Sequence, residues 1–237
     1  MQIYRAHVLV CCGTGCTSSN SEKIIKEFEN HLNKNKLDGE VKIVKTGCFG
    51  LCAQGPIVVV YPEGSMYTMV RPEDVKEIVE EHLLKGRIVK RLLAGDKEAE
   101  DVTKSLDNVD FFKRQLRIAL RNCGVINPEL IDEYIAYDGY KALGKVLTEM
   151  KPAEVIDLIK KSGLRGRGGA GFPTGLKWEF ASRSKDDQKY VCCNADEGDP
   201  GAFMDRSVLE GDPHSVIEAM AIAGYAIGAN QGYVYVR

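Results

Sequence analysis

Apolar residues in the first 86 positions follow two different periods, which predict alternating strands and helices. Ile24, Phe28 and Leu32 recur every four residues and predict one buried helical stripe. Ser19 and Glu22 have the spacing of a capping box, which predicts that this helix begins at Ser19. The pattern predicts a small α/β domain over residues 1–86, with strands at 7–10, 41–45, 57–61 and 66–70 and a second helix from Pro72.

The rest of the chain predicts a second α/β domain. Residues 87–110 are mixed in charge and weakly patterned, so we expect a linker there, followed by a domain over residues 111–237. Helices are expected at 111–122, 128–137, 139–149, 152–161, 176–182 and 213–228, and strands at 189–193 and 233–237.

Composition narrows the classes of function. The formal net charge is only −2, so nothing favours nucleic acid as a partner. The first residues lack the apolar region of a signal peptide, and the longest apolar or small run, 219–229, is too short to span a bilayer. We therefore expect a cytoplasmic protein without direct membrane insertion. In that setting its 8 cysteines indicate metal or redox chemistry, or buried thiols, rather than structural disulfides.

Four cysteines occur in two glycine-rich pairs. Cys11 and Cys16 form C-x4-C, and Cys48 and Cys52 form C-x3-C. Four thiolates are what a [2Fe–2S] cluster needs, and neighbouring glycines let the backbone approach the sulfur atoms. A structural zinc site and a set of buried thiols remain alternatives. Cys12 is expected to be a bystander.

A glycine-rich stretch at 163–178 is the second candidate site. Gly166, Gly168 and Gly171 match G-x-G-x-x-G, but a helix precedes them where a dinucleotide fingerprint has a strand. Exposed backbone N–H groups before a helix can still hold a phosphate. Arg165, Arg167 and Lys177 add positive charge, and Phe172, Trp178 and Phe180, in and just after the stretch, offer flat aromatic faces. The alternative is a surface loop whose charges only aid solubility.

An acidic loop follows the strand at 189–193. Asn194, Asp196, Glu197 and Asp199 lie within six positions. An amide and acids at a strand end can hydrogen-bond a flavin ring or ribose hydroxyls. A solvated turn and a divalent-metal loop are the alternatives.

Two long motifs carry a resemblance to a known family. GLRGRGGAGFPTGLKW and NADEGDPGAFMDR, at 163–178 and 194–206, resemble the NADH-oxidising, FMN-binding flavoprotein subunit of the complex I family. The cysteine segment resembles a thioredoxin-like [2Fe–2S] ferredoxin. The fused arrangement is similar to the beta subunit of NAD(P)-linked and electron-bifurcating iron-only hydrogenases.

The resemblance implies a fold and roles for these residues. It implies a thioredoxin-like ferredoxin domain followed by the first part of a Rossmann-like FMN-binding domain. It assigns the FMN phosphate and ring to the glycine stretch, flavin contacts to the acidic loop and nucleotide stacking to the two aromatics. The residues are Gly166, Arg167, Gly168, Gly171 and Lys177; Asn194, Asp196 and Glu197; and Phe172 and Phe180. Asp199 stands where many relatives have glutamate near the NADH ribose.

The resemblance also implies a reaction. NADH would deliver hydride to FMN, single electrons would pass to iron–sulfur clusters, and no catalytic side chain is required. It implies as partners a second thioredoxin-like [2Fe–2S] subunit and a hydrogenase or complex I-type iron–sulfur subunit. A [4Fe–4S] cluster is expected only in a missing C-terminal part, because the chain looks truncated. The alternative is an electron-carrier or docking module with a [2Fe–2S] cluster and no flavin chemistry.

Overall fold

The computed structural model describes residues 4–94 and 114–236, which form two compact units. The first unit runs up to Glu129 and also contains Glu210–Asp212, and the second contains the remainder from Leu130 on. Within the described ranges, no helix combines the length and the apolar character that crossing a bilayer requires.

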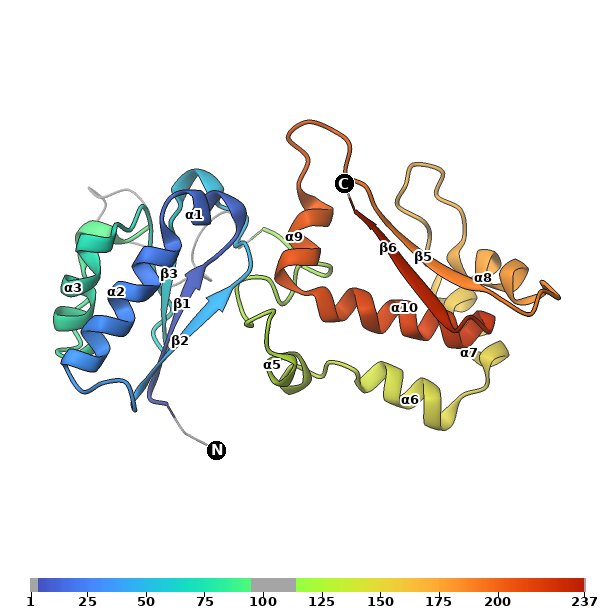
Figure 1. Ribbon diagram of the computed structural model, residues 1–237, viewed down its shortest axis with the longest axis horizontal. Coiled ribbons are helices and arrows are strands. Elements are labelled where there is room, and N and C mark those ends of the chain that lie inside the picture. The colour runs from blue at the N-terminus through green and yellow to red at the C-terminus, as the bar shows by residue number, and fades with distance from the viewer. Residues whose placement is uncertain (1–3, 95–113, 237) are drawn as a thin grey trace. The chain divides into compact units, whose positions relative to one another are not determined.

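The first unit is built on a four-stranded mixed sheet of order β2-β1-β3-β4 (Figure 1). β1 pairs with β2 in parallel, with Cys11 opposite Thr46, and with β3 antiparallel. The strands are β1 Ala6–Cys11, β2 Val41–Thr46, β3 Val58–Tyr61 and β4 Ser65–Tyr67; the helices are α1 Thr14–Ser18, α2 Ser21–Lys34 and α3 Val75–Glu77. A 3₁₀ turn, Pro72–Asp74, precedes α3, and π-helical turns, Ile78–Leu83, extend it.

Both faces of this sheet are buried. Ile24, Phe28 and Leu32 of α2 pack with Val8 and Val10 of β1 on one face, as the four-residue period predicts. The other face carries Leu9 and Cys11 together with Phe49, Ile57, Val59 and Met66. The predicted strands are confirmed within a few residues of their expected bounds. The predicted capping box is wrong: Asn20, at φ 72°, is the N-cap of α2 and makes no side-chain cap hydrogen bond.

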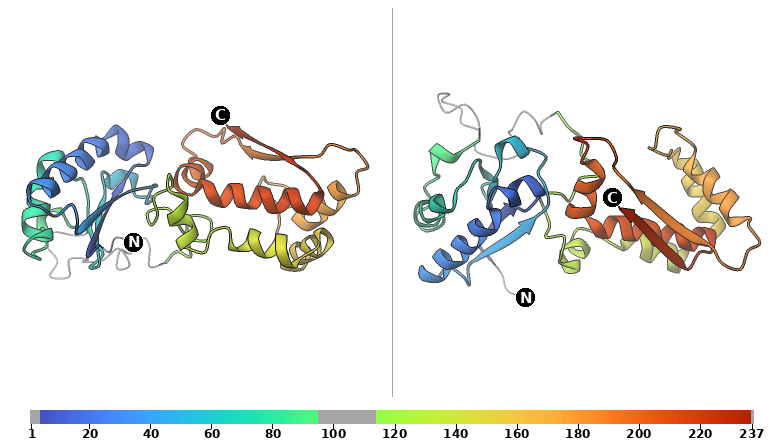
Figure 2. Two further views of the ribbon diagram at one scale, coloured as in Figure 1. Left: turned by 60° about the horizontal axis from the view of Figure 1, so that its bottom comes forward. Right: turned by 45° about the horizontal axis from the view of Figure 1, so that its top comes forward.

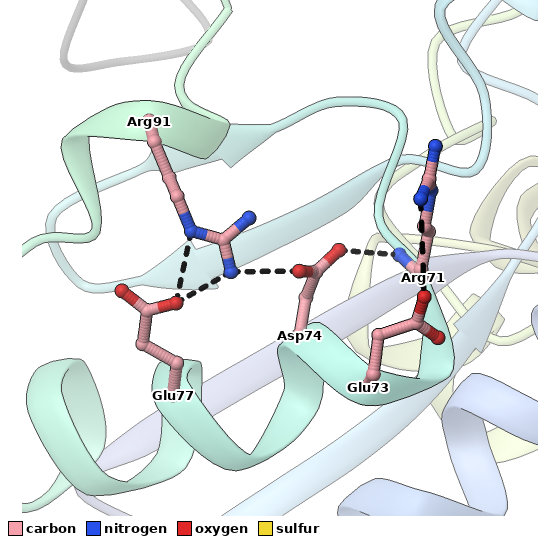
Figure 3. Close-up of polar contacts among 5 residues, drawn as sticks. All are labelled: Arg71, Glu73, Asp74, Glu77 and Arg91. Carbon is pink, nitrogen blue, oxygen red and sulfur yellow. Dashed lines mark hydrogen bonds and ion pairs between the residues drawn. The ribbon is translucent and has the colours of Figure 1, made fainter.

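The predicted linker begins later than residue 87. Val89, Leu92 and Leu93 are buried in the first core, and the Thr68 amide donates to the Leu92 carbonyl at 2.9 Å. Arg91 binds the carboxylates of Asp74 at 2.7 Å and Glu77 at 2.5 Å, beside the Arg71–Glu73 ion pair (Figure 3). Residues 88–94 are therefore part of the first unit; residues 95–110 of the predicted linker lie outside the described residues.

The second unit contains a parallel strand pair with helices beside it. β5 Tyr190–Ala195 pairs with β6 Gln231–Val236, and α10 Pro213–Ile227 connects them and runs alongside the pair (Figure 2). The other helices are α5 Ile131–Ala136, α6 Lys141–Glu149, α7 Pro152–Ser162, α8 Thr174–Ser182 and α9 Met204–Gly211. Val146, Val155, Ile156 and Ala226 form a small core.

Two elements beyond residue 110 differ from expectation. The sequence predicts a helix at 111–122, but residues 114–122 form turns and irregular structure. The Arg117 guanidinium stabilises them by donating hydrogen bonds to the carbonyls of Leu120 and Cys123. Residues 111–113 lie outside the described residues. α9 was not predicted: its 8 residues hold only three large apolar side chains, Met204, Val208 and Leu209.

Candidate functional site

The four paired cysteines gather at the carboxyl end of β1 and β2. Cys11 ends β1, Cys16 lies in α1, Cys48 follows β2, and Cys52 begins a 3₁₀ turn, Cys52–Gln54. Because β1 and β2 are parallel neighbours, the loops that leave them emerge from the same edge of the sheet. The local topology therefore brings together cysteines that are 37 positions apart, from Cys11 to Cys48.

The thiols contact one another in a chain. The Cys11 thiol is hydrogen-bonded to those of Cys16 and Cys48, and the Cys48 and Cys52 sulfur atoms lie 3.5 Å apart. Hydrogen bonding to Cys16 and burial raise the pKa of Cys11 to about 12, while the bond from Cys11 lowers the pKa of Cys16. The pKa of Cys48 is also raised, first by its hydrogen bond with Cys11.

The four thiols differ in how deeply they are buried. In the described part of the chain, no three His, Cys, Asp or Glu side chains form a single-ion site. Cys11 and Cys16 are buried, Cys48 is half-buried and Cys52 is exposed, so the site has an inner pair and an outer pair. Four thiols in this setting fit a [2Fe–2S] cluster.

Backbone groups complete the pocket. The Gly50 amide donates to the Cys48 sulfur at 3.3 Å, as amides do around cluster sulfur atoms. A Cβ added to Gly13 would lie 2.8 Å from the Cβ of Cys48, and one added to Gly55 would lie 2.7 Å from the Cys16 sulfur. Gly55 was not predicted as part of the site, because it stands outside the cysteine motifs. Cys12 packs with the α2 side of the sheet, away from this group.

The glycine stretch of the second unit is a small hairpin. Arg165 and Pro173 form an antiparallel bridge, closed where the Gly166 amide donates to the Phe172 carbonyl at 2.9 Å. The amide of Gly166 is therefore engaged within the hairpin. A Cβ added to Gly168 or Gly171 would meet nothing within 4 Å, so the tip is open.

Charge and aromatic surface accompany this hairpin. Arg167 and Lys177 are exposed. The rings of Phe172 and Phe180 are tilted, with centroids 6.4 Å apart and about half of each side chain exposed. This pair, one residue from the hairpin and one from α8, gives an exposed apolar surface in the same segment as the two cations.

The acidic loop leaves the carboxyl end of β5. Asp196 and Asp199 are exposed, and the Asn194 side chain accepts from the Asp196 amide at 3.1 Å. Glu197 differs from expectation: its carboxylate accepts from the amides of Met204, Asp205 and Arg206 at 2.6, 3.1 and 3.2 Å. It therefore caps α9. This loop and the glycine hairpin extend from the same side of the unit (Figures 1 and 2).

Comparison with known proteins matches both halves to domain families. Residues 2–83 match the thioredoxin-like [2Fe-2S] ferredoxin family, and residues 159–237 match the Nuo51 FMN-binding domain. These matches confirm the predicted fold: a thioredoxin-like ferredoxin fold followed by part of an α/β FMN-binding domain.

Longer relatives share these segments. The chain is 73% identical over 125 residues to the NADP-reducing hydrogenase subunit HndC of Solidesulfovibrio fructosivorans, covering 53% of this chain and 25% of the relative. It is 53% identical to an NADH-quinone oxidoreductase subunit of Rhizobium meliloti, over 51% of this chain and 28% of the relative. It is 34% identical to the NAD-reducing hydrogenase HoxS subunit alpha of Cupriavidus necator, over 91% of this chain and 33% of the relative. The chain thus spans a quarter to a third of the length of these relatives.

Proposed function

We propose, from the premise that this chain is homologous to flavoprotein subunits of NADH dehydrogenases and NAD(P)-reducing hydrogenases, that it carries electrons between a nicotinamide nucleotide and iron–sulfur centres. The observation that carries the proposal is the gathering of four thiols beside a sheet edge in a chain that also matches an FMN-binding domain. A multi-subunit redox complex is the setting that these relatives suggest.

Cys11, Cys16, Cys48 and Cys52 are the proposed ligands of a [2Fe–2S] cluster. Such a cluster supplies one-electron transfer when it is bound. The sheet holds Cys11 and the short helix α1 holds Cys16, so the inner pair is fixed by regular structure. The Gly50 amide stabilises negative charge on the Cys48 sulfur. Because Cys52 is exposed, the outer pair is the proposed side of electron exchange with a partner.

The glycine hairpin and the acidic loop are the proposed start of a flavin site. Arg167, Gly168, Gly171 and Lys177 suit the phosphate of FMN, because they combine an open backbone with positive charge. FMN supplies hydride acceptance from NADH and single-electron release when it is bound. Gly166 shapes the hairpin rather than donating its amide.

The remaining contacts are proposed for the flavin ring and the nucleotide. Phe172 and Phe180 suit stacking on the nicotinamide nucleotide. Asn194, Asp196 and Asp199 suit hydrogen bonds to the flavin ring or ribose hydroxyls. We assign Glu197 an indirect role here, because it holds the helix that follows the loop.

Domain bounds and partners extend the proposal. We place the cluster domain at residues 1–86, with 88–94 packed onto its core, and the start of the flavin domain at residues 130–237, later than the expected residue 111, because residues 114–129 belong to the first compact unit. The partners proposed are a second thioredoxin-like [2Fe–2S] subunit and a hydrogenase or complex I-type iron–sulfur subunit. The second candidate function is an electron-carrier module without flavin chemistry, favoured by the compactness of the first unit.

The test begins with anaerobic reconstitution in iron and sulfide, metal analysis and an EPR spectrum after dithionite reduction. A rhombic signal that is lost in Cys16→Ser and Cys48→Ser, but kept in the matched control Cys12→Ser, is the expected result. A chain that binds zinc and gives no signal would refute the cluster. FMN titration followed by flavin fluorescence then separates the two candidates: binding weakened by Lys177→Ala supports flavin chemistry, and no binding favours the carrier module.

A further inference from the structure

A turn outside both matched segments lies against the cysteine loop. Residues 120–126 belong to the same compact unit as the four thiols, although they follow the first matched segment, which ends at residue 83. The turn is closed where the Val125 amide donates to the Asn122 carbonyl at 3.0 Å. We call these residues the bracket turn.

The contact between the bracket turn and the cysteine loop joins Gly124 to Phe49. A Cβ added to Gly124 would lie 2.5 Å from Cδ1 and 2.7 Å from Cε1 of the Phe49 ring. Atoms essentially never approach so closely, so the ring fits only because residue 124 has no side chain. Gly124 also adopts φ +81°, a conformation that side chains disfavour.

Phe49 links the bracket turn to the proposed ligands. It stands between Cys48 and Gly50, whose amide donates to the Cys48 sulfur, and its ring is only 1% exposed. The ring packs in the same cluster of buried residues as Cys11 and Cys16. A shift of the ring therefore moves the backbone that carries Cys48 and the amide that faces its sulfur.

The bracket turn is itself held firmly. The Arg117 guanidinium donates to the carbonyls of Leu120 at 2.8 Å and Cys123 at 2.7 Å. Cys123 and Ile126 are fully buried. A turn fixed on both sides of Gly124 resists displacement by the ring, because densely packed interiors transmit strain.

We infer that the bracket turn positions the cysteine loop, with Gly124 and Phe49 as positioning residues for the [2Fe–2S] cluster. The inference rests on the proposed function, because it assigns the cluster to these thiols. Hydrogen bonds to the sulfur atoms and exclusion of water set the potential of such a cluster. The segment between the two matched domains thereby influences the reduction potential of the cluster.

The chain offers a matched pair of variants to test this. Gly124→Ala introduces both left-handed strain and a clash with Phe49. Gly86→Ala introduces the same strain at φ +68°, where a Cβ meets nothing within 4 Å. The reconstituted full chain of each is compared by EPR g-values, by redox titration and by the rate of cluster loss in a chelator.

Gly124→Ala is expected to change the g-values and midpoint potential and to lose its cluster about tenfold faster than Gly86→Ala, since overpacking is costly. Adding Phe49→Leu to Gly124→Ala makes room for the new methyl group and is expected to slow the loss of the cluster again. Identical spectra, potentials and loss rates for the two alanine variants would overturn the inference. If Gly124→Ala does not fold, the single variant Phe49→Leu is tested in its place. It is expected to shift the midpoint potential of the cluster, and an unchanged potential would overturn the inference.

A cluster-free measurement separates this inference from the proposed function. In the apoprotein, Gly124→Ala is expected to raise the alkylation rate of the buried Cys123 thiol several-fold above that of Gly86→Ala. If the wild-type chain gives no iron–sulfur signal, the proposed function fails. If the wild-type chain gives the signal but the two alanine variants behave alike in both assays, only the inference about the bracket turn fails.

Discussion

The Glu218 carboxylate on α10 accepts a hydrogen bond of 2.6 Å from the Tyr134 hydroxyl on α5. The same buried carboxylate accepts from the amides of Tyr140 and Leu143, both at 3.0 Å, at the amino end of α6. One side chain thus accepts from amides at the start of α6 and also holds α5. A capping residue usually does this for its own helix, whereas Glu218 does it from a distant part of the chain.

Removing this carboxylate should destabilise the second unit. Glu218→Ala removes the acceptor of three hydrogen bonds and is expected to lower the free energy of unfolding by about 3 kcal/mol. Urea unfolding followed by the fluorescence of Trp178, the single tryptophan, which lies in the same unit, measures this. Glu149→Ala, at the exposed end of α6, is the matched control, and equal stability of the two variants would contradict the capping role.

The sequence predicts the helices here but not the residue that joins them. The apolar period and Pro152 and Gly163 define helices from local information alone, and the structure confirms them within a few residues. Glu218 lies 75 positions beyond Leu143, and nothing in a four-residue pattern shows which distant acid satisfies an amino end. The capping contact comes from packing rather than from local propensity.

A buried histidine should make the first unit sensitive to acid. The Tyr67 hydroxyl accepts from the Val89 amide at 3.1 Å and is hydrogen-bonded to Nδ1 of His82 at 2.8 Å. Burial lowers the pKa of His82, and Glu63, 3.7 Å from Nε2, only partly opposes this. The unfolded chain then binds a proton before the folded one does, and stability falls as pH drops below about 6.5.

The expected loss is at most about 1.4 kcal/mol for each pH unit between the unfolded and the lower folded pKa. Urea midpoints measured from about pH 7.5 to about pH 5 test this slope. His82→Gln should flatten it, while His31→Gln, which replaces a histidine away from Tyr67, should keep it. A slope that persists in His82→Gln would assign the acid sensitivity to other groups.

Two glycines beside the proposed ligands should be required for binding of the cluster. Gly13 and Gly55 have ordinary φ values of −59° and −72°, so alanine brings no backbone strain. The added methyl group would nevertheless meet Cys48 at 2.8 Å and Cys16 at 2.7 Å. Both alanine variants are expected to retain about tenfold less cluster after reconstitution, because overpacking displaces the ligands.

Gly15→Ala is the matched control for these variants. Its added Cβ would lie 3.6 Å from the Cβ of Cys52, an ordinary contact, so near-normal iron content is expected. Iron and sulfide analysis together with visible absorbance gives the comparison. Full cluster content in Gly13→Ala or Gly55→Ala would show that the loops relax around the methyl group.

The candidate site was predictable in its residues and less so in its contacts. Residue type and spacing single out the four cysteines, and the parallel register of β1 and β2 explains why they meet. Gly124 and Phe49 could not be paired from sequence, because their contact depends on how a turn outside the domain packs. Glu197 illustrates the same limit: its position suggests a ligand contact, while its carboxylate serves the helix that sequence patterns missed.

Replacing Glu197 should loosen α9 before any cofactor is added. The carboxylate accepts from three amides at the start of that helix, and losing such a cap costs about 1–2 kcal/mol. Glu197→Ala is therefore expected to speed hydrogen exchange at Met204, Asp205 and Arg206 about tenfold, since each 1.4 kcal/mol is a factor of ten. Asp199→Ala, which changes an exposed acid of the same loop, should leave those amides protected. Unchanged exchange in cofactor-free Glu197→Ala would contradict the capping role of this carboxylate.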